Sequence, residues 1–301
     1  MPADPALQTL RDFVRWGASL FEAKGLFYGH GTDNALDESY GLVVQALNLP
    51  FELPAIYLEA ALTEAERERL HGLIARRANE RIPVPYLVNK AWFCGLPFYV
   101  DERVLIPRSP IGELIEARFE AFVEPERVAR ILDIGTGSGC IAIACAHAFG
   151  HVQVDAVDIS AEALDVARRN IQEHGVAERV RAIESDLFSA LGDNRYDLIV
   201  SNPPYVDTQE MNDRPAEFRA EPALALEAGE DGLDIVRRLL AQAETHLSED
   251  GLLIVEVGAS QDALEDAFPE IPFLWLEFER GGEGVFLLSA TQLREHRDGL
   301  R

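Results

Sequence analysis

The sequence has few cysteines, few bases and no long apolar run. Its 301 residues include three cysteines, and 27 lysines and arginines stand against 52 aspartates and glutamates. Cys94, Cys140 and Cys145 lack the spacing of a metal site and are too few for a disulfide framework, which indicates a reducing compartment. No apolar run approaches the roughly 18 residues of a membrane span, and the first residues do not form a signal peptide. We therefore expect a cytoplasmic protein without a metal site.

The shortage of bases also limits the partners. The formal net charge is −25, and no concentrated stripe of lysine or arginine occurs. Solubility is the simplest explanation of such a charge. The charge also disfavours bare nucleic acid, whose phosphates are bound by clustered bases, and it favours a basic partner.

The N-terminal region has the pattern of helices. Apolar residues recur at helical spacing in residues 7–23, 38–49 and 63–81. Thr63 and Glu66 form a capping-box pattern at the start of the third segment. We expect residues 1–82 to form a small helical domain, with His30 in a turn between two helices rather than in a metal site.

Residues 83–108 change in character. They are rich in aromatic and branched residues, and Gly95 and Pro97 lie between two strand-like runs. This pattern is typical of a β-hairpin, which we expect to link the helical domain to the rest of the chain.

Strand and helix patterns alternate over residues 109–301. Strands are expected at residues 130–135, 152–160, 179–186, 196–202, 251–258, 273–280 and 284–290, and helices at 139–150, 161–175 and 232–247. Such alternation predicts an α/β fold with a mostly parallel sheet. The last two strands, joined by a tight turn at Gly281 and Gly282, must pair antiparallel.

The stretch LDIGTGSGC, residues 132–140, lies between the first of these strands and its helix. Ligands of open α/β sheets bind at this edge, and Gly135, Gly137 and Gly139 allow close approach of the backbone. The glycine spacing differs from that of nicotinamide-binding loops, and no P-loop lysine follows. A tight turn without a ligand is the alternative.

Acidic residues follow the strands at the same edge. Asp133 precedes the glycine loop, and Asp158 ends the second strand, where a carboxylate can accept hydrogen bonds from ribose hydroxyls. Asp186 ends the third strand, within reach of an adenine amino group. The pattern therefore favours an adenosine-containing ligand.

LDIGTGSG together with Asp158 and Asp186 resembles the class I methyltransferases, which bind S-adenosylmethionine. The resemblance implies a Rossmann-like sheet of seven strands with one antiparallel strand. It places Asp133 at the methionine end of the cofactor, Asp158 at the ribose and Asp186 at the adenine edge. The cofactor-binding set that it implies is Asp133, Gly135, Thr136, Gly137, Gly139, Asp158, Ile159, Asp186, Leu187 and Asn202.

The stretch SNPPYVDT, residues 201–208, follows the fourth strand. An amide nitrogen is a poor nucleophile, and two acceptors that hold its hydrogens can align it and stabilise growing positive charge. The Asn202 side-chain oxygen and the Pro203 carbonyl suit this role, because Pro203 and Pro204 have a fixed φ and no N–H. Tyr205 can stack on a planar amide or base. These four residues form the predicted catalytic set, although a proline pair can also simply end a strand.

NPPY resembles the motif of methyltransferases that act on planar amino groups, which include adenine-modifying DNA enzymes and protein-glutamine methyltransferases. Residues 105–115 and 217–235 accompany it in the bacterial glutamine enzymes. RSPIGE at 108–113 departs from the release-factor branch, and with residues 28–39 it resembles the branch that methylates ribosomal large-subunit protein three. A basic ribosomal protein is thus the expected substrate.

Several alternatives stay open. They are glutamine methylation of release factors, adenine methylation of nucleic acid, and a module that binds S-adenosylmethionine without transferring its methyl. The acidic segment 207–231, with Glu217, Arg219, Glu221 and Pro222, is either a substrate-side lid or a solvated loop. The modified glutamine, the assembly state of the substrate and the oligomeric state of the enzyme are not determined by the sequence.

Overall fold

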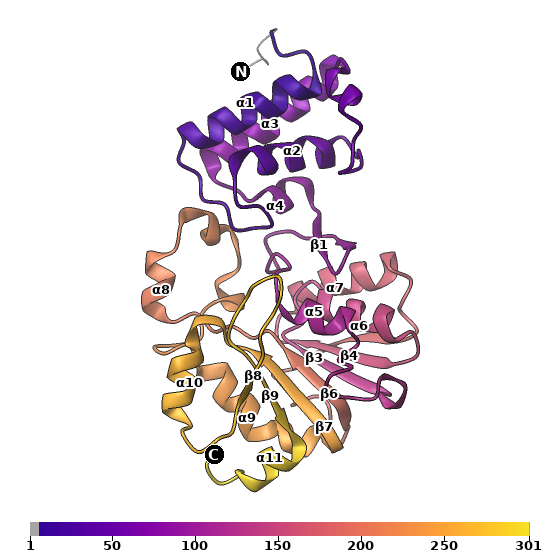
Figure 1. The fold of residues 1–301 in the computed structure, drawn as a ribbon, viewed down its shortest axis with the longest axis vertical. Coiled ribbons are helices and arrows are strands. Elements are labelled where there is room, and N and C mark those ends of the chain that lie inside the picture. The colour runs from indigo at the N-terminus through magenta and orange to yellow at the C-terminus, as the bar shows by residue number, and fades with distance from the viewer. Residues whose placement is uncertain (1–5, 301) are drawn as a thin grey trace. The chain divides into compact units, whose positions relative to one another are not determined.

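The structure is a computed structural model that describes residues 6–300, so the ends of the predicted domains 1–82 and 109–301 lie outside it. The chain forms two compact units, each described here by itself (Figure 1). The first unit contains the residues up to Lys90, Val100–Glu102 and Pro215–Ala220. The second contains Ala91–Tyr99, Arg103–Arg214 and the residues from Glu221 onward.

Amphipathic helices build the first unit around its own core. They are α1 (Leu10–Ala23), α2 (Ala35–Ala46), α3 (Glu64–Glu80) and α4 (Val84–Val88), with the 3-10 helices η1 (Ala55–Glu59) and η3 (Ala216–Ala220). The predicted capping box is confirmed, since Thr63 Oγ1 accepts from Glu66 N and Glu66 Oε2 accepts from Thr63 N. Phe13 and Leu42 are among the fully buried residues of this core.

A segment far along the chain contributes a buried charge to the helical unit. The Glu217 side chain is fully buried, and it accepts from Phe27 N at 3.0 Å and from Arg81 Nη1 at 2.8 Å, with Arg77 Nη1 at 3.5 Å. Burial opposes ionisation, but these partners hold the pKa of Glu217 below its usual value. The alternative of a solvated loop is therefore wrong for Glu217, whereas Arg219 is exposed.

A hairpin opens the second unit. Strands β1 (Ala91–Phe93) and β2 (Leu96–Phe98) pair antiparallel. The turn consists of Cys94 and Gly95, both with positive φ, as the two-residue turns that match strand twist require. Pro97 lies inside β2 opposite Trp92, not in the turn as predicted, and a two-stranded ribbon tolerates it because each strand has a free edge.

A seven-stranded sheet of order β5-β4-β3-β6-β7-β9-β8 forms the centre of the second unit. Its strands are β3 (Arg130–Ile134), β4 (Gln153–Asp158), β5 (Val180–Glu184), β6 (Tyr196–Ser201), β7 (Leu247–Glu256), β8 (Leu274–Trp275) and β9 (Val285–Ser289). Only β9 runs opposite to the others, which confirms the predicted α/β sheet with one antiparallel strand. The predicted tight turn is wrong, because β8 ends at Trp275 and residues 276–284 connect it to β9.

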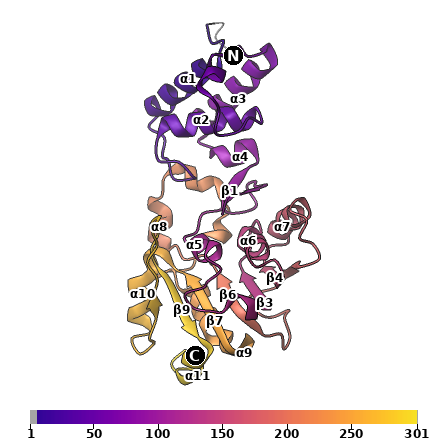
Figure 2. The ribbon, with the colours of Figure 1, turned by 45° about the vertical axis from the view of Figure 1, so that its right-hand side comes forward.

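Helices cover both faces of this sheet (Figures 1 and 2). One face carries α5 (Ile111–Glu116), α6 (Cys140–Phe149) and α7 (Ala161–Glu173), and the other carries α9 (Asp234–His246), α10 (Gln261–Ala267) and α11 (Ala290–Glu295). Leu198 and Val200 of β6 join the core on the first face, and Ile199 joins the core on the second. The apolar strands thus supply two cores by simple alternation.

The order of the strands sets the position of the site. From β3 the chain moves outward to β4 and β5, and then returns to β6 and β7 on the other side of β3. The order in which strands are added to the sheet therefore reverses between β3 and β6, which are themselves parallel. Sheets of this kind bind ligands beyond the carboxyl ends of the strands at such a switch point. The glycine loop follows β3, and residues 202–205 follow β6.

Candidate active site at the sheet switch point

The glycine loop and the asparagine of NPPY adjoin at this switch point. Gly135, Gly137 and Gly139 all have positive φ, which side chains rarely adopt. A Cβ atom at Gly135 would lie 3.8 Å from the backbone oxygen of Asn202. The N–H groups of Gly135 and Thr136 both donate to Val157 O at 2.9 Å, so the loop is tied to β4. Two motifs that are more than sixty residues apart in the sequence therefore adjoin at one edge of the sheet.

Asp133 is completely buried at the end of β3. Its Oδ2 accepts from Thr136 Oγ1 at 2.6 Å and from Ala142 N at 3.1 Å. Burial raises the pKa of Asp133 to about 7, against the effect of these two hydrogen bonds. Asp133 Oδ1 and Ser138 Oγ are buried and have no partner among residues 6–300. Because buried polar atoms need partners, this loop fits a ligand that offers hydrogen-bond donors or positive charge.

Asp158 ends β4 beside the loop. Its Oδ2 accepts from Gly137 N and its Oδ1 from Ser160 N, both at 2.9 Å, while burial raises its pKa. Each carboxylate oxygen has two lone pairs, so both oxygens can accept one further hydrogen bond. The next residue, Ile159, is 54% exposed. An exposed aliphatic side chain next to a half-satisfied carboxylate suits a ligand with hydroxyl groups and an apolar face.

Asp186 and Leu187 occupy the connection after β5. The Asp186 carboxylate is half exposed and accepts from Arg238 Nη2 of α9 at 2.7 Å. Leu187 is buried and has a positive φ of 50°, and its backbone oxygen accepts from Ser185 Oγ at 2.7 Å. Arg238 was not anticipated, and any ligand group at Asp186 must share the carboxylate with it.

Asn202 and the prolines follow β6 directly, at the switch point of the sheet. Asn202 is half-buried, and its Nδ2 donates to Arg108 O at 3.4 Å. This weak hydrogen bond turns the nitrogen toward Arg108 and leaves Oδ1 as an acceptor for an incoming group. Pro203 is buried and Pro204 is half-buried. The predicted catalytic residues are thus in one place, next to the predicted cofactor loop.

Tyr205 has partners that sequence reasoning missed. Its Oη donates to Glu256 Oε1 at 2.9 Å, and Glu256 Oε2 accepts from Ser109 Oγ at 2.6 Å. Glu256 ends β7 and is 5% exposed, and burial raises its pKa to about 7. The sequence held one signal for Glu256, an acid at the end of the apolar run GLLIVE. This run forms β7, and the neighbouring strand β6 leads into the NPPY motif. Burial likewise raises the pKa of Tyr205.

A second carboxylate from segment 207–231 is also fixed in the second unit. Glu221 accepts from both terminal nitrogens of Arg108 at 2.7 Å and from Ile106 N at 3.1 Å. Its side chain is fully buried, so the solvated-loop alternative is wrong here as well. Arg108 is the residue whose carbonyl receives Asn202 Nδ2, and this ion pair therefore supports the position of the asparagine.

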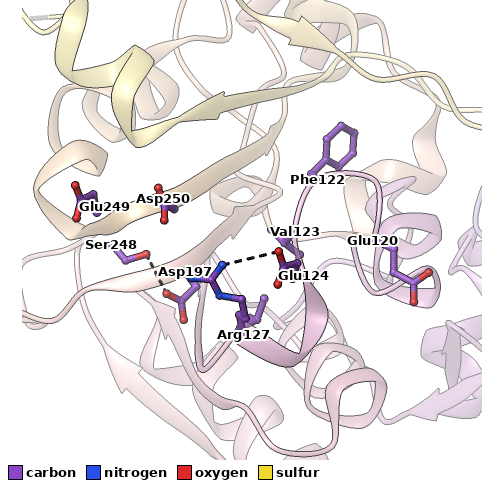
Figure 3. A pocket seen from close by; sticks show the side chains of 10 residues that line it. Glu120, Phe122, Val123, Glu124, Arg127, Asp197, Ser248, Glu249 and Asp250 are labelled. Atoms are coloured by element: carbon purple, nitrogen blue, oxygen red, sulfur yellow. Dashed lines mark hydrogen bonds and ion pairs between the residues drawn. The ribbon is translucent and has the colours of Figure 1, made fainter.

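A cavity of about 660 Å³ lies at the opposite, amino-terminal edge of the sheet (Figure 3). It is lined by Glu120, Phe122, Val123, Glu124, Arg127, Val128, Asp197, Ser248, Glu249 and Asp250. Asp197 in its wall accepts from Ser248 Oγ and from two backbone N–H groups, at 2.9–3.0 Å. Its carboxylate therefore ties β6 to β7 and the start of β3, and none of the predicted site residues lines this cavity.

Comparison with known proteins points to the same part of the chain. Residues 119–229 match the model of the methyltransferase small domain family. The chain is 45% identical over 296 residues to the ribosomal protein uL3 glutamine methyltransferase of Francisella tularensis subsp. tularensis, covering 98% of this chain and 94% of the relative. It is 50% identical over 288 residues to the enzyme of the same name from Neisseria meningitidis serogroup B, covering 95% of each.

Among solved structures, the hMettl16 catalytic domain in complex with an RNA hairpin aligns with a TM-score of 0.50. The alignment covers 74% of this chain and 80% of that domain at 17% identity. At this identity the likeness concerns the fold alone.

Proposed function

This chain belongs to the ribosomal protein uL3 glutamine methyltransferases, and we propose that it methylates a glutamine side-chain nitrogen of uL3, large-subunit protein three, with S-adenosylmethionine. The observation that carries the proposal is the approach of Asn202 to Gly135 at the switch point. In the reaction a nitrogen–carbon bond forms, the sulfur–carbon bond of the donor breaks, and the amide nitrogen loses a proton.

The cofactor side of the site supplies charge and hydrogen bonds. S-adenosylmethionine brings an electrophilic methyl group on a positively charged sulfur. The unpartnered Asp133 Oδ1 and Ser138 Oγ suit its polar, cationic methionine end, and the free lone pairs of Asp158 suit its ribose hydroxyls. Ile159 would pack on the adenine, and Asp186 and Leu187 would lie at its edge. The backbone of Gly135, Thr136, Gly137 and Gly139 lets the cofactor approach closely.

The acceptor side aligns the amide. Asn202 Oδ1 and the Pro203 carbonyl accept the two hydrogens of the glutamine NH₂ group, which orients the nitrogen and stabilises the positive charge that develops on it. Pro204 restricts the backbone, and the ring of Tyr205 stacks on the planar amide. No strong base is required, because the acidity of the nitrogen rises as the new bond forms.

Charge supports a basic protein substrate. Residues 91–301 carry 40 acids against 18 bases, whereas residues 1–90 carry 12 against 9. The acidic excess is therefore concentrated in the part with the methyltransferase fold, and it steers a free, basic ribosomal protein toward the site in the cytoplasm. We assign substrate recognition to the helical domain 1–82.

The proposal is tested by incubating the enzyme with methyl-labelled S-adenosylmethionine and, separately, uL3, a peptide release factor and an adenine-containing duplex. Label on uL3 alone, mapped to a glutamine side chain, is the expected result. Label on the release factor alone would retain the chemistry and overturn the substrate. Label on the duplex alone would overturn the inference from charge, and cofactor binding without transfer to any of them would indicate a binding module.

Steering is tested separately. The association rate with uL3 should fall by about tenfold as salt rises, because screening removes the long-range attraction. Stopped-flow fluorescence across a salt series measures it. A rate that does not change with salt would contradict the role given to net charge.

A further inference from the structure

Glu256 connects two hydroxyl groups that come from distant parts of the chain. Tyr205 Oη donates to Oε1 and Ser109 Oγ donates to Oε2, so each oxygen of one carboxylate receives its own hydrogen bond. The carboxylate is 5% exposed and lies at the end of β7, adjacent to the strand that leads into Asn202. Glu256 is therefore the common partner of the loop before α5 and of the NPPY motif.

The directions of these hydrogen bonds are determined by the surroundings. Ser109 Oγ accepts from Ile111 N at 3.2 Å and donates its single hydrogen to Glu256 Oε2 at 2.6 Å. An ionised carboxylate only accepts, so the Tyr205 hydrogen must also point toward it. The Tyr205 hydroxyl is thus committed as a donor to Glu256 and can act toward a substrate only as an acceptor.

Other groups fix the rest of Tyr205. Its backbone oxygen accepts from Ser260 Oγ at 2.8 Å. Gly258 packs directly against the ring, since a Cβ atom there would lie 2.7 Å from it. The ring face, the backbone and the hydroxyl are each held by a different partner. Removing the partner of the hydroxyl leaves a buried polar group unsatisfied and allows the ring to move.

The charges that face Glu256 decide its ionisation. Burial favours the neutral form, and the hydrogen bonds from Ser109 and Tyr205 and the charge of Arg108 favour the ionised form. Arg108 is itself paired with Glu221, which limits the attraction that it offers. A proton on Glu256 would weaken both hydrogen bonds, because a neutral carboxyl is a poorer acceptor than a carboxylate. The three-residue chain of Ser109, Glu256 and Tyr205 therefore holds Tyr205 most firmly when Glu256 is ionised.

We infer that Glu256 is a positioning residue for methyl transfer: through its hydrogen bond to Tyr205 it holds the ring that lines the acceptor side of the site. The inference rests on the proposed function, because it takes residues 202–205 as the site of the glutamine amide. It requires that the loss of Glu256 slow methyl transfer to the glutamine amide and leave the affinity for the cofactor unchanged. Ser109 has a positioning role as well, because it holds Glu256, which in turn holds Tyr205.

The first test is Glu256→Gln, which keeps the shape but replaces one acceptor oxygen with a donor. We expect kcat/KM for uL3 to fall by about 10- to 100-fold, the scale of a small misalignment of reacting groups, while the cofactor Kd from calorimetry stays within about twofold. At saturating cofactor, where the affinity change expected from Asp133 does not contribute, kcat/KM for uL3 should rise as pH increases through about 7 in the wild type, and the variant should lose this rise. A flat wild-type profile, or an equal loss of cofactor affinity, would overturn the inference.

Two variants control for the chemical change itself. Glu244→Gln alters another carboxylate with two partners, Arg294 and Arg297, on α9 away from the site, and it should leave kcat/KM unchanged. Tyr205→Phe removes the hydrogen bond between Tyr205 and Glu256 by deleting its donor. The double variant Tyr205→Phe with Glu256→Gln should therefore be no slower than the slower single variant. Losses that multiply would show that the two residues act independently.

A readout without substrate separates this inference from the proposed function. Fluorinated tyrosine can be incorporated, and the Tyr205 resonance identified among the seven tyrosines by its loss in Tyr205→Phe. This resonance should shift with pH near 7 in the wild type and should not in Glu256→Gln. If that variant does not fold, Ser109→Ala serves in its place: it removes a hydrogen bond that lowers the pKa of Glu256, so the shift should move to higher pH. A Tyr205 signal independent of Glu256 would overturn the inference whatever protein is methylated. Failure of the wild type to label uL3 would instead count against the proposed function.

Discussion

The cofactor side and the acceptor side of the proposed site are held together in different ways. On the cofactor side, Asp133 bonds to residues three and nine positions away, and Asp158 bonds to Gly137, 21 positions away. On the acceptor side, Tyr205 bonds to Glu256 across 51 positions and Asn202 bonds to Arg108 across 94. The cofactor side is thus held within one β-α-β unit, β3-α6-β4, whereas the acceptor side depends on segments much further apart in the chain. Substitutions on the cofactor side should therefore change mainly cofactor affinity, and substitutions on the acceptor side should change mainly turnover.

The largest effect is expected from Asn202→Ala on the acceptor side. Removing one preorganised acceptor should lower kcat by about 10²-fold or more, with the cofactor Kd almost unchanged. Single-turnover transfer to uL3 and calorimetry with S-adenosylmethionine measure the two quantities. Asn194→Ala, at the amino-terminal edge of the sheet, is the matched control. Weaker cofactor binding with normal turnover would reverse the assignment of the two sides.

Asp158→Ala should have the opposite signature. The loss of hydrogen bonds to a charged acceptor should weaken cofactor binding by about 1.5–3 kcal/mol, while kcat at saturating cofactor is largely retained. Titration calorimetry gives the affinity, and Asp165→Ala on the exposed face of α7 controls for the loss of a carboxylate. If kcat at saturation fell as far as the affinity, the two sides would not be separable.

Cofactor affinity should also depend on pH through Asp133. Because burial raises the pKa of Asp133 to about 7, the carboxyl is largely neutral at pH 6 and largely ionised at pH 8. A cationic ligand favours the ionised form, so affinity should increase with pH over this range, by up to about tenfold. Binding measured across the range in the wild type and in Asp133→Asn tests this, and the variant should show a flat profile. Tighter binding at pH 6 would contradict the sign.

The smallest effect on the site is expected from Asn170 of α7, which supports the glycine loop from behind. This buried amide accepts from Tyr99 N and donates to Tyr99 O and Ser138 O, at 2.8–3.0 Å. Asn170→Ala should lower the free energy of unfolding by about 1–3 kcal/mol, because backbone groups lose their partners. Denaturant titration measures the loss, and KM for the cofactor should rise only a few-fold. Asn79→Ala, at an exposed asparagine, is the control. If Asn170→Ala lowered the free energy of unfolding no more than Asn79→Ala does, the glycine loop would be held without Asn170.

The sequence allowed the position in the fold of the predicted cofactor-binding residues to be anticipated, while their roles stay a prediction. Asp133, the glycines and Asp158 all lie at the end of a strand or in the turn after it, and strand periodicity locates such positions without knowledge of partners. Asn202 to Tyr205 were located by the same rule. Two predictions were wrong: the tight turn at Gly281 and Gly282, and the position of Pro97 in the hairpin turn. Both concern short strands, whose ends are set by pairing and not by composition.

The sequence by itself determined the α/β alternation, the antiparallel last strand and the two motifs at strand ends, since each follows from local periodicity and chain connectivity. Only the tertiary structure decided that Ser109, Glu256 and Tyr205 share one carboxylate, that Glu221 neutralises Arg108 and that Glu217 is buried in the helical unit. Ser109 and Glu256 read as ordinary polar residues in the sequence. Their partners are set by the order of strands and the packing of distant segments, because a buried charge is stable only where the fold brings its counterpart.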